Sequence, residues 1–325
     1  MKTAIIGCGS IGHKRAGGLS ANADLVGCFD INSELSKNFA LQYAIKQFES
    51  LDEILSDSSI DFVIVATTHN ALADIAIKAL KNSKHVFIEK PGSISAKLLR
   101  KIVQISRERK LIAHIGYNHR YHPAISKAIS MANSGEIGPI MFLRARYGHG
   151  GRLGYENEWR FKKDISGGGE LIDQGTHLID ISLAILGDLA LNYALTPTYF
   201  WKSEVEDNAF ICLSTDEGSV AFLHASCTEW KNTFSLEIYG KNAKVEVSGL
   251  GRSYGTETLK VYRMKPQMGP PKIERFEFAE QDVSWELEIK EFIEDIERGT
   301  NRTDNLNTSV RVLEIVEDIY VRNNK

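Results

Sequence analysis

The sequence predicts an α/β domain followed by a domain with a wide, mostly antiparallel sheet. Over the first 120 residues, short apolar runs alternate with amphipathic helical segments, which is the pattern of βαβ units and a parallel sheet. Residues 190–265 alternate apolar and polar positions between turn signals, as antiparallel strands do. The 325 residues are too many for one ordinary core, so we expect two domains, 1–120 and 121–325.

The elements follow from local patterns. In the first domain we expect five buried strands: TAIIG, DLVGCFD, FVIVATT, HVFIEKP and LIAHIGYN. Between them we expect the helices IGHKRAGGLS, ALADIAIKALKNS and SAKLLRKIVQISRERK. In the second domain we expect a helix AISKAISMANSG and the strands IMFLRARYG, NAFICLST, SVAFLHASC, FSLEIYG and KVEVSG. Two helices close the chain, the first with Trp285, Ile289, Phe292, Ile293 and Ile296 on one face.

Composition and charge exclude several classes of function. The net charge of -3 offers no basic field for nucleic acid, and 43% hydrophobic with 25% charged residues is typical of a globular protein. The sequence contains no uncharged run of 18 residues, so we expect no membrane-spanning helix. The N-terminus lacks the pattern of a signal peptide. Four scattered cysteines without a CxxC pair fit a reducing cytoplasm.

A G-x-G-x-x-G motif, GCGSIG, follows the first strand and opens the first helix. Gly7 permits the tight turn, Gly9 lets the backbone approach a pyrophosphate, and Gly12 allows close packing of helix on strand. The helix N-terminus offers N–H groups to phosphates. Asp30 ends the second strand, where a carboxylate accepts hydrogen bonds from a ribose 2′-OH and repels a 2′-phosphate. This context predicts a dinucleotide site that prefers NAD to NADP.

Other strand ends on the carboxyl side of the sheet are expected to face the same ligand. They are residues 66–70, residues 89–91 and residues 117–120. Lys90 in the Glu-Lys-Pro segment is the most informative, because a lysine there hydrogen-bonds a substrate hydroxyl and stabilises developing alkoxide charge. The alternative is a surface Glu–Lys pair before a turn.

The segment GGGELIDQGTHLID, residues 167–180, places Asp173 and His177 one helical turn apart. We interpret its glycines as room for substrate and nicotinamide near the backbone. A metal site built from this pair and His149 has too few ligands, and a buried structural pair is a second alternative. We favour acid/base chemistry, because oxidising a CH–OH group releases a proton that histidine accepts near neutral pH. Asp180 is expected either to orient the imidazole or to lie on the helix surface.

The loop over residues 148–160 is the predicted specificity element. Arginines bind phosphate or carboxylate in a bidentate manner, and aromatic rings stack on sugars or bases. Arg144 and Arg146 alternate with apolar residues, so one strand face is expected to aim both guanidinium groups into the cleft. The alternative is a solvated loop. The expected substrate-binding residues are Arg146, His149, Arg152, Tyr155, Trp159 and Arg160.

Together, GCGSIG, EKP, GYNHRYHP and WR…SGGGELIDQGTHLID resemble the Gfo/Idh/MocA oxidoreductases over essentially the whole chain. The resemblance implies an N-terminal Rossmann domain and a C-terminal domain with a large open sheet that makes homodimer or homotetramer contacts. It implies hydride transfer between nicotinamide and a hydroxyl-bearing carbon, with a catalytic set of Lys90, Asp173 and His177.

The resemblance also implies the cofactor contacts. They are Gly7, Gly9, Ser10, Ile11, Gly12, Asp30, Thr67, Glu89, Lys90 and Asn118. One departure is visible in the loop after the third strand, where many members read T-P-x-x-x-H and this chain reads TTHNAL. Thr68 replaces the proline, Leu72 replaces the histidine, and His69 comes earlier, so the detailed contacts of this loop are expected to differ from those of many members.

We therefore expect a cytoplasmic, NAD-dependent dehydrogenase or reductase that acts on CH–OH groups of a sugar or sugar derivative, nucleotide-linked or acidic. No metal, nucleic acid or membrane partner is expected. Two alternatives stay open: an NAD-dependent glycosidase that oxidises its substrate transiently, and a regulator that senses nucleotides without catalysis.

Overall fold

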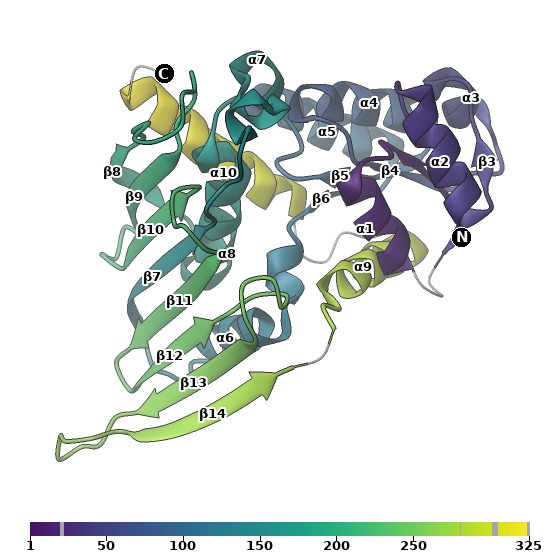
Figure 1. Ribbon diagram of the computed structural model, residues 1–325. Helices are drawn as coiled ribbons and strands as arrows, with labels where there is room; N and C mark the ends of the chain where they lie inside the picture. Colours follow the sequence, from purple (N-terminus) through teal and green to yellow (C-terminus); the bar gives the residue numbers. More distant parts are fainter. Residues whose placement is uncertain (20–22, 280, 301–304, 324–325) are drawn as a thin grey trace. The chain divides into compact units, whose positions relative to one another are not determined.

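The chain forms two compact units in the computed structural model, which describes residues 1–19, 23–279, 281–300 and 305–323 (Figure 1). Unit 1 consists of Met1–Asn118 and Trp285–Leu313, and unit 2 of His119–Ser284 and Glu314–Lys325. The first boundary lies close to the expected residue 120. The expected second domain differs from unit 2, because residues 285–313 join unit 1. A division by function at residue 120 stays a prediction.

Unit 1 is built on a six-stranded parallel sheet in the order β3-β2-β1-β4-β5-β6. This order is that of the Rossmann fold, and the chain reverses direction across the sheet between β1 and β4. The strands are β1 (Lys2–Ile6), β2 (Asp24–Phe29), β3 (Lys46–Gln47), β4 (Phe62–Val65), β5 (His85–Glu89) and β6 (Ala113–Gly116). The five strands expected from apolar runs are confirmed, and β3 is an addition at the edge.

The helices of unit 1 include two that the apolar pattern does not reveal. The first, α2, has only Ser36, Phe39 and Ala40 buried, while Leu35 and Leu41 are exposed, so its apolar face is blurred. Short α3 spans less than two turns. The helices are α1 (Ser10–Leu19), α2 (Ser33–Tyr43), α3 (Leu51–Ser56), α4 (His69–Lys81), α5 (Ala96–Arg109) and α9 (Ser284–Arg298).

Helix α9 packs in the core of unit 1, although it lies in the part of the sequence that was expected to form the second domain, 121–325. The Phe292 ring meets Phe62 and Phe87 edge-on, with centroids 5.4 and 5.5 Å apart. Ile289 and Ile293 lie in the same buried cluster. The sequence identifies the apolar face of this helix, but nothing in its pattern tells which sheet that face will meet.

Unit 2 is built on an eight-stranded sheet in the order β14-β13-β12-β11-β7-β10-β9-β8. All neighbours are antiparallel except β7 and β10, which confirms the expected mostly antiparallel sheet. The strands are β7 (Ile140–Gly148), β8 (Ala190–Leu195), β9 (Asn208–Ser214), β10 (Val220–Ser226), β11 (Thr233–Gly240), β12 (Ala243–Ser248), β13 (Glu257–Arg263) and β14 (Lys272–Phe278).

The two faces of this sheet differ. Helices α6 (Pro123–Asn133) and α8 (Thr176–Leu186) pack on one face, against β7 and β10 to β13. Strand β11 alternates buried and half-buried residues, so Leu236 and Ile238 face the helices and Glu237 faces away. The helix expected from the GGGELID segment is α8, and a π-helical turn, η5 (Leu171–Gly175), precedes it. The C-terminal helix α10 (Asn305–Arg322) contributes its second half to unit 2.

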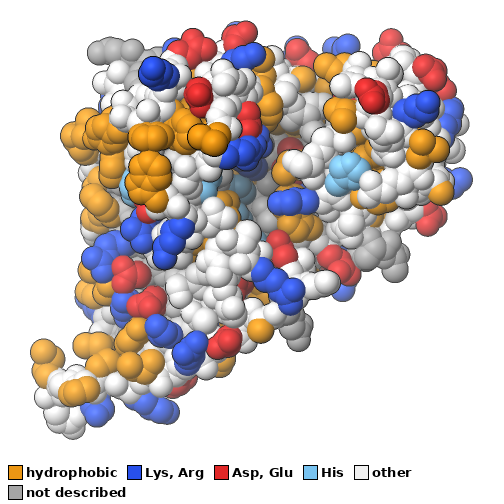
Figure 2. Space-filling view, in the orientation of Figure 1, with side chains coloured by type: hydrophobic (Ala, Val, Ile, Leu, Met, Phe, Trp, Pro, Cys, Tyr) orange, Lys and Arg blue, Asp and Glu red, His pale blue; other side chains and the backbone are white. Residues whose placement is uncertain are grey.

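The opposite face of the unit 2 sheet carries exposed side chains of two kinds. Tyr193, Leu195 and Phe222 are exposed on β8 and β10, whereas Arg144 and Lys244 pair with carboxylates on β11 and β12. Figure 2 shows hydrophobic side chains along the edge where β8 to β10 lie in Figure 1. Among the described residues, no helix is long and apolar enough to span a bilayer.

Candidate functional site

The glycine-rich turn after β1 has the geometry that its motif predicts. Gly7 has a φ of +103°, and a Cβ there would overlap the backbone of Ala66 at the end of β4. A Cβ on Gly12 would overlap the Gly7 carbonyl oxygen. Gly9 is different, because a Cβ there would meet no atom of the described residues within 4 Å. Two glycines therefore close the turn on itself, and Gly9 faces the space where a pyrophosphate would approach.

Asp30 lies at the end of β2 and is tied to this turn. Its Oδ2 accepts a hydrogen bond from the Cys8 N–H at 2.8 Å, and its Oδ1 accepts one from the Asn32 N–H at 2.8 Å. A carboxylate has about four acceptor sites, so both oxygens can still accept bonds from ribose hydroxyls. The turn, the N-terminus of α1 and this half-buried carboxylate fit the adenosine and pyrophosphate part of NAD.

The loop after β4 has the sequence TTHNAL in place of the T-P-x-x-x-H pattern, and the structure shows where its residues lie. Thr67 is half-buried, and Thr68 precedes the first turn of α4 with its Oγ1 2.9 Å from Asn70 Oδ1. His69 is 4% exposed and Leu72 is fully buried. Leu72 is therefore a core residue of α4, and its side chain takes no part in binding a ligand.

Glu89 and Lys90 follow one another at the end of β5 but have different surroundings. The Glu89 carboxylate is buried and paired with Arg15, whose guanidinium also contacts Glu288 at 2.6 Å. That guanidinium lies 4.4 Å from the Phe87 ring centroid and 4.5 Å from that of Trp285. Lys90 is half-buried and follows directly. Glu89 thus anchors the strand end that presents Lys90, and a cofactor contact of Glu89 stays a prediction.

The predicted cofactor residues of unit 1 lie at the carboxyl ends of its strands, or, for Ser10, Ile11 and Gly12, in the first turn of α1. Gly7 and Gly9 follow β1, Asp30 follows β2, and Thr67 follows β4. Lys90 follows β5, and the buried Asn118 follows β6. This is the edge at which open parallel sheets bind their ligands.

In unit 2, the π-helix η5 carries Asp173, and α8 carries His177 one turn later. Both side chains are buried, with 6% and 4% exposed. Asp173 Oδ2 accepts a hydrogen bond from Arg160 Nε at 3.1 Å. Single π-helical turns inside helices are rare and are frequent at functional sites. The Asp173–Arg160 pair joins the helix to the predicted specificity loop.

His177 lies in a cluster of rings. Its imidazole centroid is 3.6 Å from that of His119 and 6.0 Å from that of Tyr147. Burial raises the pKa of the Tyr147 phenol well above its usual value, and the neighbouring Tyr254, Asp173 and Glu170 raise this pKa further. The cluster therefore combines a buried imidazole, a phenol that stays protonated, and carboxylates.

Asp180 has neither of the two roles expected for it. Its carboxylate is 2% exposed and binds Arg120 in a bidentate manner, with both N–O distances 2.6 Å. Burial raises the pKa of Asp180, and the Arg120 guanidinium opposes this rise. A carboxylate held by an arginine in this way is neither surface nor a partner that orients His177.

The specificity loop brings His149 and Tyr155 together. His149 Nδ1 accepts the Gly151 N–H at 3.0 Å, which places the proton of the neutral ring on Nε2. This Nε2 is 3.4 Å from Tyr155 Oη and 3.7 Å from Glu170 Oε1. Burial lowers the pKa of His149. Tyr155 is 3% exposed among Phe161 and Trp201, so its ring is packed rather than free to stack on a sugar.

The four remaining predicted substrate residues have different surroundings. Arg152 is exposed and pairs with Glu158 at 2.5 Å. The Arg160 guanidinium lies 4.7 Å from the Trp159 ring centroid as well as on Asp173. The prediction that Arg146 points into the cleft is wrong. On β7 this residue alternates with the buried Tyr147, so it lies on the open face of the sheet, 3.7 Å from a Glu229 oxygen. Arg144 and Arg146 do share one face, but it is not the face that holds Asp173.

Two of the three glycines before η5 do not have the role inferred for them. Gly167 ends α7 (Lys163–Ser166) with a φ of +80°. A Cβ on Gly168 would overlap the Tyr320 hydroxyl, and a Cβ on Gly169 would overlap the Glu206 carbonyl oxygen. The interpretation as room for substrate and nicotinamide is therefore wrong for Gly168 and Gly169, whose missing side chains make room for the protein's own residues.

Several residues of this region were missed. Tyr147 follows the alternation of β7, so the strand period was an available signal. Glu170 is 3% exposed and adjacent to His149, a position that its place in the GGGELID segment does not predict. Glu206 and Arg15 offered no signal, because their partners lie 35 to 273 residues away in sequence.

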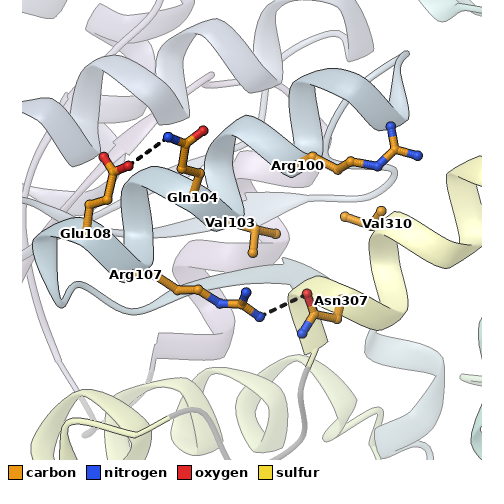
Figure 3. A pocket seen from close by; sticks show the side chains of 7 residues that line it. All are labelled: Arg100, Val103, Gln104, Arg107, Glu108, Asn307 and Val310. Atoms are coloured by element: carbon orange, nitrogen blue, oxygen red, sulfur yellow. Dashed lines mark hydrogen bonds between the residues drawn. The ribbon is translucent and has the colours of Figure 1, made fainter.

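A pocket of about 500 Å³ lies elsewhere in unit 1, between α5 and the start of α10. Val103 and Val310 are among its lining residues, and Figure 3 shows Arg107 donating to Asn307 Oδ1, a bond of 3.2 Å. None of the predicted site residues lines it. Among the described residues, no group of three or more His, Cys, Asp or Glu side chains is placed to hold a metal ion.

Comparisons with known proteins agree with both units. Residues 1–117 match a family model described as "Oxidoreductase family, NAD-binding Rossmann fold". The chain is 31% identical over 185 residues to glucose-6-phosphate 3-dehydrogenase of Bacillus subtilis (strain 168), covering 55% of this chain and 52% of that protein. It is 27% identical over 269 residues to scyllo-inositol 2-dehydrogenase (NAD(+)) of the same organism, covering 80% and 75%. The chain thus spans about half the length of the first of these relatives.

The same fold occurs in solved structures. A levoglucosan dehydrogenase in complex with NADH and levoglucosan superposes with a TM-score of 0.88 over 99% of this chain and 96% of that one. Its 21% identity shows a shared fold and nothing finer. Residues 125–246 match a second family model, "GFO/IDH/MocA C-terminal domain". With both models matched in order along the sequence, the chain belongs to the Gfo/Idh/MocA family of oxidoreductases.

Proposed function

We propose that this protein is an NAD-dependent oxidoreductase that acts on a CH–OH carbon, or the corresponding keto carbon, of a sugar or sugar derivative. The observation that carries the proposal is the turn at Gly7–Gly12, open at Gly9 and tied to Asp30. The Asp173–His177 cluster of unit 2 supports it, because sugar oxidation needs a proton acceptor and a residue that binds hydroxyls. The sugar and inositol dehydrogenases among the relatives act on substrates of this class.

Each catalytic group has a chemical role in this proposal. The bound nicotinamide supplies the hydride acceptor or donor. Lys90 donates a hydrogen bond to the reacting oxygen and stabilises its developing negative charge. His177 accepts the hydroxyl proton during oxidation and returns it during reduction, with Lys90 as the other candidate for this step. Asp173, held by Arg160, accepts hydrogen bonds from a neighbouring substrate hydroxyl.

We propose NAD as the preferred dinucleotide and a nucleotide-linked or acidic sugar as the substrate. Asp30 supports the first part, since a carboxylate at this strand end disfavours a 2′-phosphate. Arg152 supports the second, because it is an exposed guanidinium on the specificity loop. Trp159 and His149 remain proposed substrate residues. A panel of sugars, sugar phosphates and sugar nucleotides, read by NADH absorbance at 340 nm, tests the assignment.

The function is tested by removing the proposed proton and charge carriers. Lys90→Met combined with His177→Ala should lower kcat by about a thousandfold or more, because general acid–base groups contribute about 10² to 10⁴. Lys101→Met, an exposed lysine on α5, is the matched control and should turn over like the parent. Turnover of the double variant at the parent rate would contradict the mechanism. Glycoside cleavage without net NADH formation would favour the transient-oxidation glycosidase.

We further propose a homodimer or homotetramer that forms through the open face of the unit 2 sheet. Tyr193 and Leu195 on β8 and Phe222 on β10, the two strands that flank β9, are exposed and support this contact, since apolar patches of this kind mark interfaces. Phe222→Glu should lower the mass measured by light scattering, whereas Leu153→Glu, an exposed apolar residue of a loop, should not. The four free cysteines support a cytoplasmic location, which cell fractionation tests.

A further inference from the structure

Glu206 lies just before β9 and is 1% exposed. Its Oε1 accepts three hydrogen bonds: from the Gly169 N–H at 3.0 Å, from the Leu171 N–H at 3.1 Å and from the Tyr320 hydroxyl at 2.8 Å. The Glu206 carbonyl oxygen also accepts the Glu170 N–H at 3.1 Å. One residue thus binds three consecutive N–H groups of residues 169–171, where the π-helix begins.

These N–H groups belong to the start of a helix, where no backbone acceptor within the helix is available. Burial without another acceptor would leave them unsatisfied. A carboxylate also interacts favourably with the positive end of the helix. Burial raises the pKa of Glu206, and the hydrogen bonds from Tyr320, Leu171 and Gly169 oppose that rise. Glu206 therefore acts as an N-terminal cap supplied from 35 residues away along the chain.

The cap continues to the proposed catalytic residues through two further bonds. The Gly169 carbonyl accepts the Asp173 N–H at 3.1 Å. The Asp173 carbonyl accepts the Thr176 hydroxyl at 3.3 Å, and His177 follows Thr176 in the chain. Movement of residues 169–171 would therefore shift the backbone of Asp173 and, through Thr176, the start of the turn that carries His177.

The missing side chains of Gly168 and Gly169 fit the same arrangement. A Cβ at either position would overlap Tyr320 or the Glu206 backbone, so only glycine lets these two residues come so close. The glycines, the Glu206 carboxylate and the Tyr320 phenol of α10 thus form one connected cluster. We call it the η5 cap, consisting of Gly168, Gly169, Glu206 and Tyr320.

We propose that Glu206 is a positioning residue for the reaction, which fixes Asp173 and His177 by capping η5 with the help of Tyr320. The proposal rests on the function proposed above. Glu206 touches neither substrate nor cofactor in this role. Its loss should therefore impair the chemical step and leave dinucleotide binding by unit 1 unchanged.

Two mild variants test this. Glu206→Gln keeps the size and one acceptor oxygen but loses the charge, and Tyr320→Phe removes only the hydroxyl donor. We expect kcat to fall by about tenfold to a hundredfold in Glu206→Gln and by less in Tyr320→Phe, because misplacement of catalytic groups is costly. We expect the Kd for NADH to stay at the parent value. A substrate deuterated at the reacting carbon should show a larger isotope effect on kcat in both variants, as chemistry becomes rate-limiting.

The matched control is Asp207→Asn. Asp207 is also buried and accepts the backbone N–H groups of Tyr199, Phe200 and Trp201, a loop outside the η5 cap. This variant should lose thermal stability to a similar extent without the larger isotope effect. Hydrogen exchange at residues 169–171 should become faster in Glu206→Gln and remain at the parent rate in Asp207→Asn.

The outcomes separate the two proposals. A parent enzyme that oxidises sugars, together with Glu206→Gln and Tyr320→Phe variants of parent kcat and isotope effect, would overturn the positioning role and leave the function intact. A rise of the isotope effect in Asp207→Asn equal to that in Glu206→Gln would also overturn it, since general destabilisation would then be enough. A parent without turnover on any sugar would overturn the function itself, and the reaction role of Glu206 with it.

Discussion

Two glycine-rich segments of this chain look alike in sequence, but Gly9 of the first has surroundings opposite to those of Gly168 and Gly169 of the second. In the turn Gly7–Gly12 of unit 1, Gly9 faces open space, and a Cβ there would meet no atom of the described residues within 4 Å. In the segment before η5 of unit 2, Gly168 and Gly169 face Tyr320 and Glu206. Gly9 leaves open space at the proposed pyrophosphate site, whereas Gly168 and Gly169 make room for the protein's own residues. A run of glycines therefore indicates that another group comes close to the backbone, but not whether that group is a ligand or part of the protein.

The largest effect that tests this comparison is expected on stability at Gly169. In Gly169→Ala the new methyl group would overlap the Glu206 carbonyl oxygen, which is backbone and cannot rotate away. We expect the free energy of unfolding to fall by about 3 kcal/mol, the upper part of the range for overpacked sites. The midpoint of urea unfolding measures this loss. A variant as stable as the parent would mean that residues 169 and 206 can separate, and the η5 cap would lose its structural basis.

The opposite result is expected at Gly9. Gly9→Ala should change the free energy of unfolding by no more than about 0.5 kcal/mol, because the methyl group meets open space. It should nevertheless weaken NADH binding by about tenfold or more, which is about 1.4 kcal/mol or more, by blocking the approach of the pyrophosphate. NADH fluorescence titration and a thermal melt on the same samples measure both quantities.

The control for Gly9→Ala is Gly17→Ala, in helix α1, which begins directly after Gly9. Gly17 is exposed on α1, and a Cβ there would also meet no atom of the described residues within 4 Å. Gly17→Ala should raise stability slightly, since alanine is the better helix former, and leave NADH affinity unchanged. Equal NADH affinity in Gly9→Ala and Gly17→Ala would show that the pyrophosphate does not lie at Gly9, and the comparison between the two glycine segments would fail.

A smaller effect is expected at Asp30, which tests which dinucleotide binds at the glycine-rich turn of unit 1. Asp30→Asn keeps an acceptor for the Cys8 N–H but removes the charge that disfavours a 2′-phosphate. We expect the ratio of NADPH affinity to NADH affinity to rise by about tenfold, equivalent to about 1.4 kcal/mol. Asp24→Asn, at the exposed opposite end of β2, makes the same charge change and should leave the ratio unaltered. If both variants shift the ratio equally, the effect is one of net charge and Asp30 has no specific role.

The sequence predicted the fold well and the site unevenly, for physical reasons. Apolar strands such as Phe62–Val65 are buried on both faces and carry a strong local signal, so the parallel sheet was predictable. The motif at Gly7–Gly12 was predictable because its partners are local or lie on the next strands. Glu206 was not, since its hydrogen bonds reach residues 169, 171 and 320 across the chain. Arg146 was misplaced because alternation tells which residues share a face but not which face meets the helices.

The smallest expected effect concerns His149, in the specificity loop beside Glu170 and Tyr155. Burial lowers its pKa below the usual 6.5, with Asp173 opposing and Arg160 and Arg152 adding to the shift. The folded protein therefore resists protonation that the unfolded chain accepts. The sign follows: stability from the neutral ring is complete above about pH 6.5 and is lost as the pH falls from there towards the folded pKa.

His149→Asn tests this, because asparagine retains an acceptor near the position of Nδ1 for the Gly151 N–H but does not titrate. Thermal melts between about pH 7.5 and 5.5 should show the parent losing more stability than the variant as the pH falls. Curves that stay parallel over this range would mean that His149 is protonated equally in the folded and unfolded chains. The expectation that burial keeps the His149 ring neutral as the pH falls would then be wrong. A steeper loss in the parent would instead show that the His149 ring of loop 148–160, unlike the open turn at Gly9, is buried enough in the folded chain to resist protonation.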